Sequence, residues 1–269
     1  MGLTRILVTS DDGIHSPGLR AAVEVLIDMG EVTVVAPFKQ QTSMGRSYCA
    51  EPDAGLVTVP FEVNGTNVQA YGCECSPAVA IRHGMDVLFL DKNPDLVVAG
   101  INYGENLGVG ITVSGTVGAA MEGAGHGIPA LAVSLETDQK DHLSYSTEVN
   151  FSTAAHFTQI FGRMMLQKRL PADVDLLKVD VPCDASPDTP WEITRLSKQI
   201  YFESVRPKRT SWDQPETVGY RRIEELSSTG TDTDVYALRV KRVVSVTPIS
   251  LDLTSRVNLD DFDQLLREA

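Results

Sequence analysis

The chain has 269 residues, of which 42% are hydrophobic and 22% are charged. This composition is typical of a globular protein, so it excludes a disordered or fibrous chain, and the length allows one or two domains. The 36 acidic and 23 basic residues leave a formal net charge of −13. Such a charge repels nucleic acid and anionic membranes, so we expect neither as a partner. A phosphate group would have to be bound by a metal ion or by backbone N–H groups.

The N-terminus and the cysteines favour a cytoplasmic protein. Met1 is followed at once by a strand-like segment, with no apolar stretch typical of a targeting signal and no run long enough to span a membrane. The four cysteines, at positions 49, 73, 75 and 183, lack the paired spacing of a metal site. We therefore predict a cytoplasmic location with reduced thiols.

Strand and helix signals alternate through the first two-thirds of the chain. Strands alternating with helices indicate βαβ units and a mainly parallel sheet. The predicted strands cover residues 5–10, 31–36, 56–63, 67–70, 95–99, 130–134 and 176–181. The predicted helices cover residues 17–29, 76–90, 115–125 and 146–167.

After Val181 the regular alternation of strand and helix signals ends. Five prolines between positions 182 and 215 interrupt helices, and residues 191–196, 235–241 and 243–247 have the pattern of antiparallel strands. Residues 199–222 are charged and aromatic without a clear period. This segment is either an arm that pairs with another subunit or a long surface loop, and its length favours the arm. We predict a core over residues 1–181 and a β-rich extension over residues 182–269, within one domain.

The strongest local signal for chemistry is Asp11-Asp12-Gly13, at the end of the first predicted strand. Ligands of parallel sheets bind beyond the carboxyl ends of the strands, so both acids lie at the functional edge. Two adjacent carboxylates repel each other, and a divalent cation such as Mg²⁺, Mn²⁺ or Ca²⁺ offsets that repulsion. The alternative is that one aspartate caps the following helix while the other points to solvent.

A glycine-rich loop over residues 100–116 follows the strand at 95–99. It ends in Ser114-Gly115-Thr116, which opens a helix of small residues, and helix N-termini bind anions. The loop matches neither the dinucleotide fingerprint nor the P-loop, which would need a lysine. The alternative is a tight packing loop. A third loop, residues 40–47, is polar and contains one arginine.

Six motifs spread over almost the whole chain make the sequence similar to a known family. They are RILVTSDDGIHSPG (5–18), GINYGENLG (100–108), SGTVGAAMEG (114–123), GIPALAVS (127–134), GTD (230–232) and VTPISLDLT (246–254). With these motifs the chain resembles the SurE family of stationary-phase survival proteins, which are metal-dependent nucleotidases acting on nucleoside 5′- and 3′-monophosphates. The resemblance implies a Rossmann-like three-layer α/β/α domain, a swapped C-terminal extension, and a homodimer or homotetramer.

The resemblance also implies a set of site residues. One divalent cation, Mg²⁺ or Mn²⁺, would be bound by Asp11, Asp12, Thr42 and Asn102. The phosphate would be bound by Asn106, Ser114, Gly115 and Thr116. Asp12, Asn106 and Ser114 would be catalytic, with Asp12 and a water on the metal both open as the group that attacks or takes the proton.

Departures from the family pattern lie around the expected substrate entrance. They are Phe38-Lys39, residues 109–113 and residues 72–78. The altered residues 109–113 motivate an alternative, a degenerate member that binds metal and nucleotide with little or no hydrolysis. A phosphatase of the haloacid dehalogenase kind is disfavoured, because it needs Asp-x-Asp.

Overall fold

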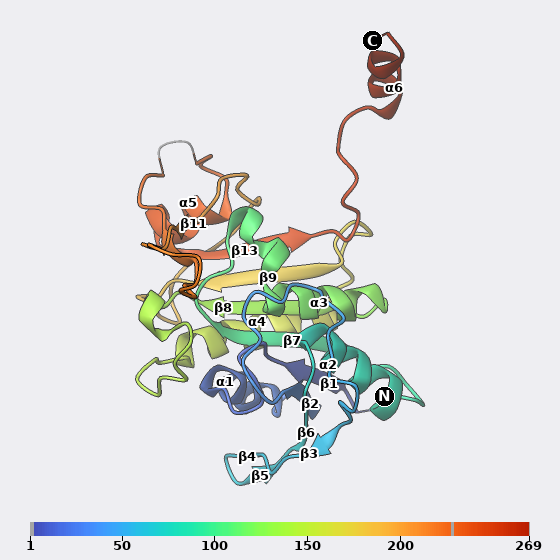
Figure 1. Ribbon diagram of the computed structural model, residues 1–269. Helices are drawn as coiled ribbons and strands as arrows, with labels where there is room; N and C mark the ends of the chain where they lie inside the picture. Colours follow the sequence, from blue (N-terminus) through green and yellow to red (C-terminus); the bar gives the residue numbers. More distant parts are fainter. Residues whose placement is uncertain (1–2, 227–228, 269) are drawn as a thin grey trace.

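A nine-stranded sheet forms the centre of the computed structural model, which describes residues 3–226 and 229–268 (Figure 1). In spatial order the strands are β10 (Trp191–Ile193), β13 (Val244–Ile249), β9 (Leu176–Val181), β8 (Ala130–Leu135), β7 (Leu96–Tyr103), β1 (Arg5–Thr9), β2 (Glu31–Pro37), β6 (Gln69–Cys73) and β3 (Val57–Thr58). All neighbouring pairs from β9 to β6 are parallel. The predicted α/β class with a mainly parallel sheet is confirmed.

Helices cover both faces of the sheet. Ile6 and Val8 pack on one side in a cluster with residues of α1 (Pro17–Leu26) and α4 (Ser152–Gln167). Leu7 points the opposite way, into a second cluster with α2 (Pro77–His83) and α3 (Gly115–Gly125). Because both faces are buried, the central strands are continuously apolar rather than alternating. The predicted three-layer arrangement is confirmed.

Several predicted elements differ in length. The helix expected over 76–90 is α2 followed by a π-helical turn, η1 (Gly84–Leu88), and the helix expected from 146 begins at Ser152. The strand expected over 95–99 continues to Tyr103 through an irregularity between Ala99 and Asn102. Smaller elements are β4 (Glu62–Val63), β5 (Thr66–Asn67), η2 (Gly108–Val113) and η3 (Gln139–Asp141).

The region after Val181 completes the sheet. β13 is antiparallel to β9, as predicted, but β10 is parallel to β13, so the antiparallel prediction for β10 is wrong. The strand predicted over 235–241 is also wrong, because α5 (Asp234–Tyr236) and the π-helical η4 (Ala237–Lys241) occupy that segment. Thr233 explains the difference: its hydroxyl accepts the N–H of Tyr236 at 3.3 Å and begins a helix. The boundary at residues 181/182 stays a prediction.

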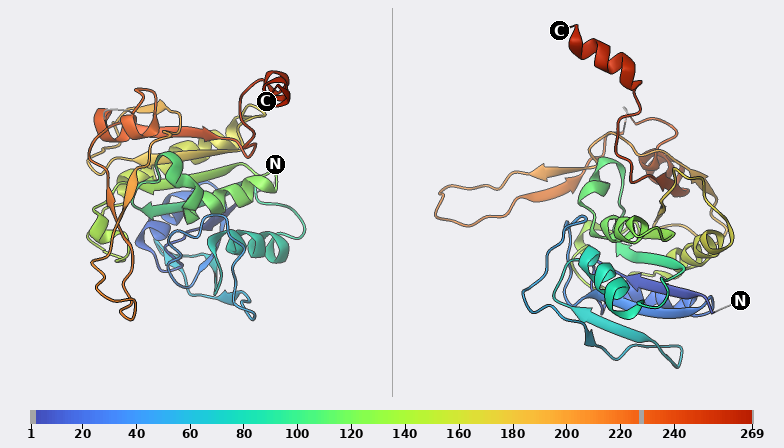
Figure 2. Two further views of the ribbon diagram at one scale, coloured as in Figure 1. Left: turned by 45° about the horizontal axis from the view of Figure 1, so that its top comes forward. Right: turned by 90° about the vertical axis from the view of Figure 1, so that its right-hand side faces the viewer.

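Two segments extend away from the body. Strands β11 (Phe202–Val205) and β12 (Gly219–Arg222) form an antiparallel hairpin that projects from the sheet (Figure 2). The expected arm therefore exists, while its pairing with another subunit stays a prediction. Helix α6 (Leu259–Arg267) stands apart at the end of an extended segment (Figure 1). Within the described residues, no helix has the length and apolar character needed to cross a membrane.

The cysteines depart from the prediction of four reduced thiols. Cys73 and Cys75 are joined in a disulfide, so the prediction is wrong for this pair. Cys49 and Cys183 are free.

Candidate active site

Asp11 and Asp12 lie directly after β1 and are almost completely buried, with exposed fractions of 5% and 2%. One carboxylate oxygen of Asp12 accepts the backbone N–H of Tyr103 at 3.0 Å, and the other accepts from the Gln40 amide at 2.6 Å. The Thr116 hydroxyl donates to Asp11. The alternative in which one aspartate is exposed and the other caps α1 is therefore wrong, since the N-cap residue of α1 is Ser16.

The electrostatics of this pair suit a bound cation. Burial raises the pKa of Asp11 to about 6, and burial together with the neighbouring charge of Asp11 raises the pKa of Asp12 well above its usual value. Among residues 3–226 and 229–268, no basic side chain forms an ion pair with either carboxylate. Two buried acids with hard oxygen donors and no cationic partner fit a divalent metal.

Asn102 is brought to the same edge by the irregularity in β7. Gly100 has φ of +127°, and a Cβ there would lie 2.3 Å from the carbonyl oxygen of Val133, so a glycine is required at this bend. The side-chain nitrogen of Asn102 donates to the carbonyl of Gly104 at 2.6 Å. This bond uses the amide nitrogen, and the amide oxygen is the atom that a hard cation would bind.

The N-terminus of α3 contacts Asp11 directly. A Cβ at Gly115 would lie 2.7 Å from the Cβ of Asp11 and 2.8 Å from its Oδ2. Ser114 caps the helix, accepting the Val117 N–H at 3.1 Å. Ser114, Gly115 and Thr116 therefore lie beside the carboxylates, as predicted from the sequence motifs, with backbone N–H groups unused by the first helical turn.

Asn106 also lies at this edge of the sheet, whereas Thr42 lies on a neighbouring loop. The Asn106 side chain donates to the Ser134 hydroxyl at 2.8 Å, and Ser134 is the sheet partner of Asn102. Thr42 is exposed and follows Gln41, whose N–H donates to the backbone carbonyl of Asp11 at 2.6 Å. The carboxylates, Asn102, Asn106 and the first turn of α3 are thus brought together, with Thr42 on the adjoining loop.

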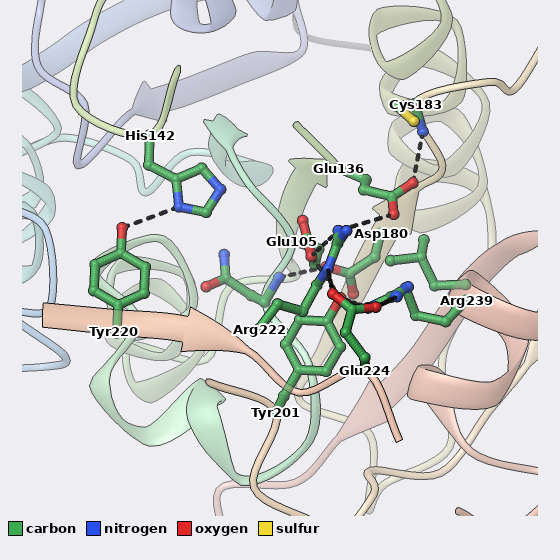
Figure 3. A network of polar contacts seen from close by, with 12 residues as sticks. Glu105, Glu136, His142, Asp180, Cys183, Tyr201, Tyr220, Arg222, Glu224 and Arg239 are labelled. Atoms are coloured by element: carbon green, nitrogen blue, oxygen red, sulfur yellow. Dashed lines mark hydrogen bonds and ion pairs between the residues drawn. The ribbon is translucent and has the colours of Figure 1, made fainter. Parts of the chain in front are cut away.

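Sequence reasoning noted the polar loop at residues 40–47 but did not assign Gln40, His142, Tyr220 or Arg222 to the site. Gln40 bridges Asp12 and the carbonyl of His142, with 2.6 Å to each. His142 faces Tyr220 of the hairpin, with 3.1 Å between Nδ1 and the hydroxyl, and burial lowers the pKa of His142 (Figure 3). Arg222, two residues along β12, lies 3.7 Å from Glu105. The one sequence signal that could have linked Tyr220 and Arg222 is strand alternation, because side chains two residues apart in a strand point to the same face.

Comparisons with known proteins show which family the chain is similar to. The family model described as Survival protein SurE matches residues 6–203. The 5'-nucleotidase SurE of Thermococcus kodakarensis is 44% identical over 266 residues, covering 97% of this chain and 98% of the relative, and that of Thermococcus gammatolerans is 42% identical over 262 residues, covering 97% and 96%. The crystal structure of the SurE protein from Aquifex aeolicus superposes with a TM-score of 0.77 at 29% identity, covering 97% of this chain and 99% of that one.

Proposed function

Because this chain belongs to the survival protein SurE family, we propose that it hydrolyses nucleoside 5′- and 3′-monophosphates to nucleoside and phosphate. The 5'-nucleotidase name of its full-length relatives supports the reaction class. The observation that carries the proposal is the buried pair Asp11 and Asp12 beside the N-terminus of α3. This arrangement offers a cation site and an anion site in contact, which a phosphate monoester needs on an acidic protein.

The proposed metal ligands are Asp11, Asp12, Asn102 and Thr42, for one Mg²⁺ or Mn²⁺. All four supply oxygen, which these hard cations prefer. When bound, the cation would supply positive charge that polarises the phosphoryl oxygens.

The proposed phosphate site uses donors that the fold leaves available. The Asn106 amide has two hydrogens, and Ser134 takes one of them, so the second can donate to a phosphoryl oxygen. The Ser114 oxygen accepts the Val117 N–H, which leaves its own hydrogen to donate. Because the Thr116 hydroxyl donates to Asp11, its contribution to phosphate binding is its backbone N–H, next to that of Gly115.

We assign proton transfer to Asp12. Of the proposed catalytic groups, Asn106 and Ser114 serve as hydrogen-bond donors toward phosphate, and Asp12 alone is a carboxylate that can accept a proton from an attacking water. Gln40 and the Tyr103 N–H hold its two oxygens in place.

A substitution at Asp11 tests the proposal. In Asp11→Asn we expect phosphate release from nucleoside monophosphates, measured with Mg²⁺ or Mn²⁺, to fall to background. The control is Asp91→Asn, an exposed acid at the opposite end of the sheet, which should keep wild-type activity. Equal turnover by Asp11→Asn and wild type would contradict the proposal, as would appreciable turnover after complete chelation.

Assays with a panel of substrates distinguish the enzyme from the alternative, a degenerate member that binds nucleotide without hydrolysing it. Wild-type protein is assayed with p-nitrophenyl phosphate and several nucleotides, alongside calorimetric nucleotide binding. Binding without hydrolysis of any of them would favour the alternative, whereas turnover favours the enzyme.

We also propose a homodimer or homotetramer built through the C-terminal extension. The exposed apolar residues of α6 and the projecting hairpin support this assembly. A small nucleotide is the expected partner, with no nucleic-acid surface, and the cytoplasmic location stays a prediction.

A further inference from the structure

Three completely buried charged side chains lie next to the loop that carries Asn106. Lys178 and Asp180 point to the same side of β9, and Asp234 is the first residue of α5; each has an exposed fraction of 0%. The Lys178 ammonium contacts Asp180 and lies 3.3 Å from Asp234. We call these three residues the buried triad. The two carboxylates raise the pKa of Lys178 despite its burial, so the lysine is charged.

The two carboxylates of the triad accept backbone N–H groups from the loop that carries Asn106. Asp180 accepts the N–H of Asn106 at 2.8 Å, and Asp234 accepts the N–H of Gly108 at 2.8 Å. The second oxygen of Asp234 accepts the N–H of Ser197 at 2.9 Å. Lys178 thus links two anchors placed two residues apart on the same loop.

The residue between the two anchors is also held. Leu107 is buried in a small cluster with Tyr201, Val235 and Leu238, which all follow residue 182. Gly108 has φ of +56°, and a Cβ there would lie 2.9 Å from the carbonyl oxygen of Ser197. The backbone of residues 106–108 is therefore fixed at three consecutive positions.

A cluster of this kind is not explained by stability alone. Buried ion triads are often no more stabilising than apolar residues of the same size, because desolvation offsets the attraction between the charges. This one places two buried carboxyl groups around one buried ammonium group. The use that distinguishes it from apolar packing is directional, since carboxylates accept N–H groups and side chains such as leucine cannot.

We propose that Asp180 and Asp234, bridged by Lys178, are positioning residues that fix the Asn106 amide for phosphate binding. The role in catalysis rests on the proposed function, while the role in fixing the loop does not. Neither aspartate touches the reacting atoms; both act through the backbone of residues 106–108.

Kinetics of Asp180→Ala test the catalytic part. Removing the acceptor of the Asn106 N–H should lower kcat for a nucleoside monophosphate by about 10- to 100-fold, as misplacement of a positioned group does. Asn106→Ala should lose activity to a similar degree, and the double variant should lose no more than Asn106→Ala alone. Losses that multiply would show that Asp180 does not act through Asn106 and would overturn the proposal.

A conservative variant and a matched control complete the kinetic series. Asp180→Asn keeps an oxygen that can accept the Asn106 N–H, so it should recover most of the activity lost in the alanine variant. Asp95→Ala removes the same kind of bond, a carboxylate accepting the Arg5 N–H at 2.9 Å, at the opposite end of the sheet. It should lower thermal stability without lowering kcat. Equal kcat losses in Asp95→Ala and Asp180→Ala would make the effect structural.

Hydrogen–deuterium exchange tests the loop without using activity. In Lys178→Met and Asp234→Ala, peptides covering residues 104–108 should exchange at least about tenfold faster than in wild type, because the first variant loses the bridge between the two carboxylates and the second loses the acceptor of the Gly108 N–H. Peptides of β1 and β2 should stay unchanged. Unchanged exchange at 104–108 in both variants would overturn the proposal even if Asp180→Ala fails to fold. If wild type hydrolyses no nucleotide, the proposed function fails, and this measurement still decides whether the triad fixes the loop.

Discussion

Asp11 and Asp12 are buried and form no ion pair with a basic side chain among the described residues, so the stability of the protein should depend on pH. Burial raises the pKa of Asp11 to about 6 in the folded protein, above its value of 3.8 without burial. The folded state therefore holds this proton more tightly than the unfolded state does. The stabilising contribution is complete below about pH 4 and is lost as the pH rises through about 6.

Asp11→Asn should remove this pH dependence. In the presence of a chelator, the free energy of unfolding of wild type should fall relative to the variant by on the order of 1 kcal/mol between about pH 5 and pH 7.5. Denaturant titrations of both proteins at the two pH values measure the difference. A constant difference between the proteins would contradict the raised pKa.

Gly115 should be intolerant of even one added methyl group. Gly115→Ala would place a Cβ 2.7 Å from the Asp11 side chain and displace the carboxylate, so we expect about a 100-fold loss of the proposed nucleotidase activity. Gly110→Ala is the matched control, because a Cβ there meets nothing within 4 Å. A similar loss in both variants would show that contact with Asp11 is not the cause. Metal binding by calorimetry provides a readout independent of turnover.

The residues of the candidate site differ in how far the sequence could predict them. Asp11 and Asp12 follow an apolar strand, and Ser114-Gly115-Thr116 opens a helix, so local pattern places them at one edge. Gln40 and His142 carry no such signal. They meet through a contact 102 residues apart in sequence, which depends on the path of two loops.

At the level of elements, local pattern predicts the buried parallel strands well and the extension poorly. β9 has the predicted bounds because it is buried on both faces, and α3 has them because Ser114 caps its first turn. The segment 235–241 reads as a strand by alternation, but Thr233 caps a helix there. A hydroxyl cap next to a short run outweighs the weak β pattern.

Arg242, in the C-terminal extension, connects the residue after β8 to the segment after β9, and this contact should contribute to stability. Arg242 bonds to Glu136 with 2.6 Å between Nη2 and Oε2, and also to Asp184 at 2.6 Å. Although Glu136, Cys183 and Asp184 lie close enough to bind a metal, this guanidinium already pairs with both carboxylates. Glu136→Ala should lower the free energy of unfolding by about 2 kcal/mol, because Glu136 is buried.

Asp184→Ala is the control for this contact. Its side chain is 61% exposed, so its loss should lower the free energy of unfolding by less than about 1 kcal/mol. Equal effects of the two substitutions in denaturant titrations would contradict the assignment of the anchor to Glu136.

At the scale of the whole molecule, α6 presents an apolar face that the described chain leaves exposed. Leu259, Phe262, Leu265 and Leu266 lie on one side of the helix, each 46% to 62% exposed. If this face holds a second copy of the chain, Leu265→Glu should shift the oligomer to a smaller species in light scattering. Gln264→Glu adds the same charge on the opposite side and should leave the mass unchanged. An unshifted mass in Leu265→Glu would argue against assembly through α6.

The bond between Gly108 and Asp234 joins positions 126 residues apart. During synthesis, Asp11, Asp12 and residues 106–108 emerge long before Asp234, which accepts the Gly108 N–H. A nascent chain lacking α5 would contain the proposed catalytic side chains, but residues 106–108 would lack their second anchor. The proposed activity is therefore expected only once the chain extends past α5.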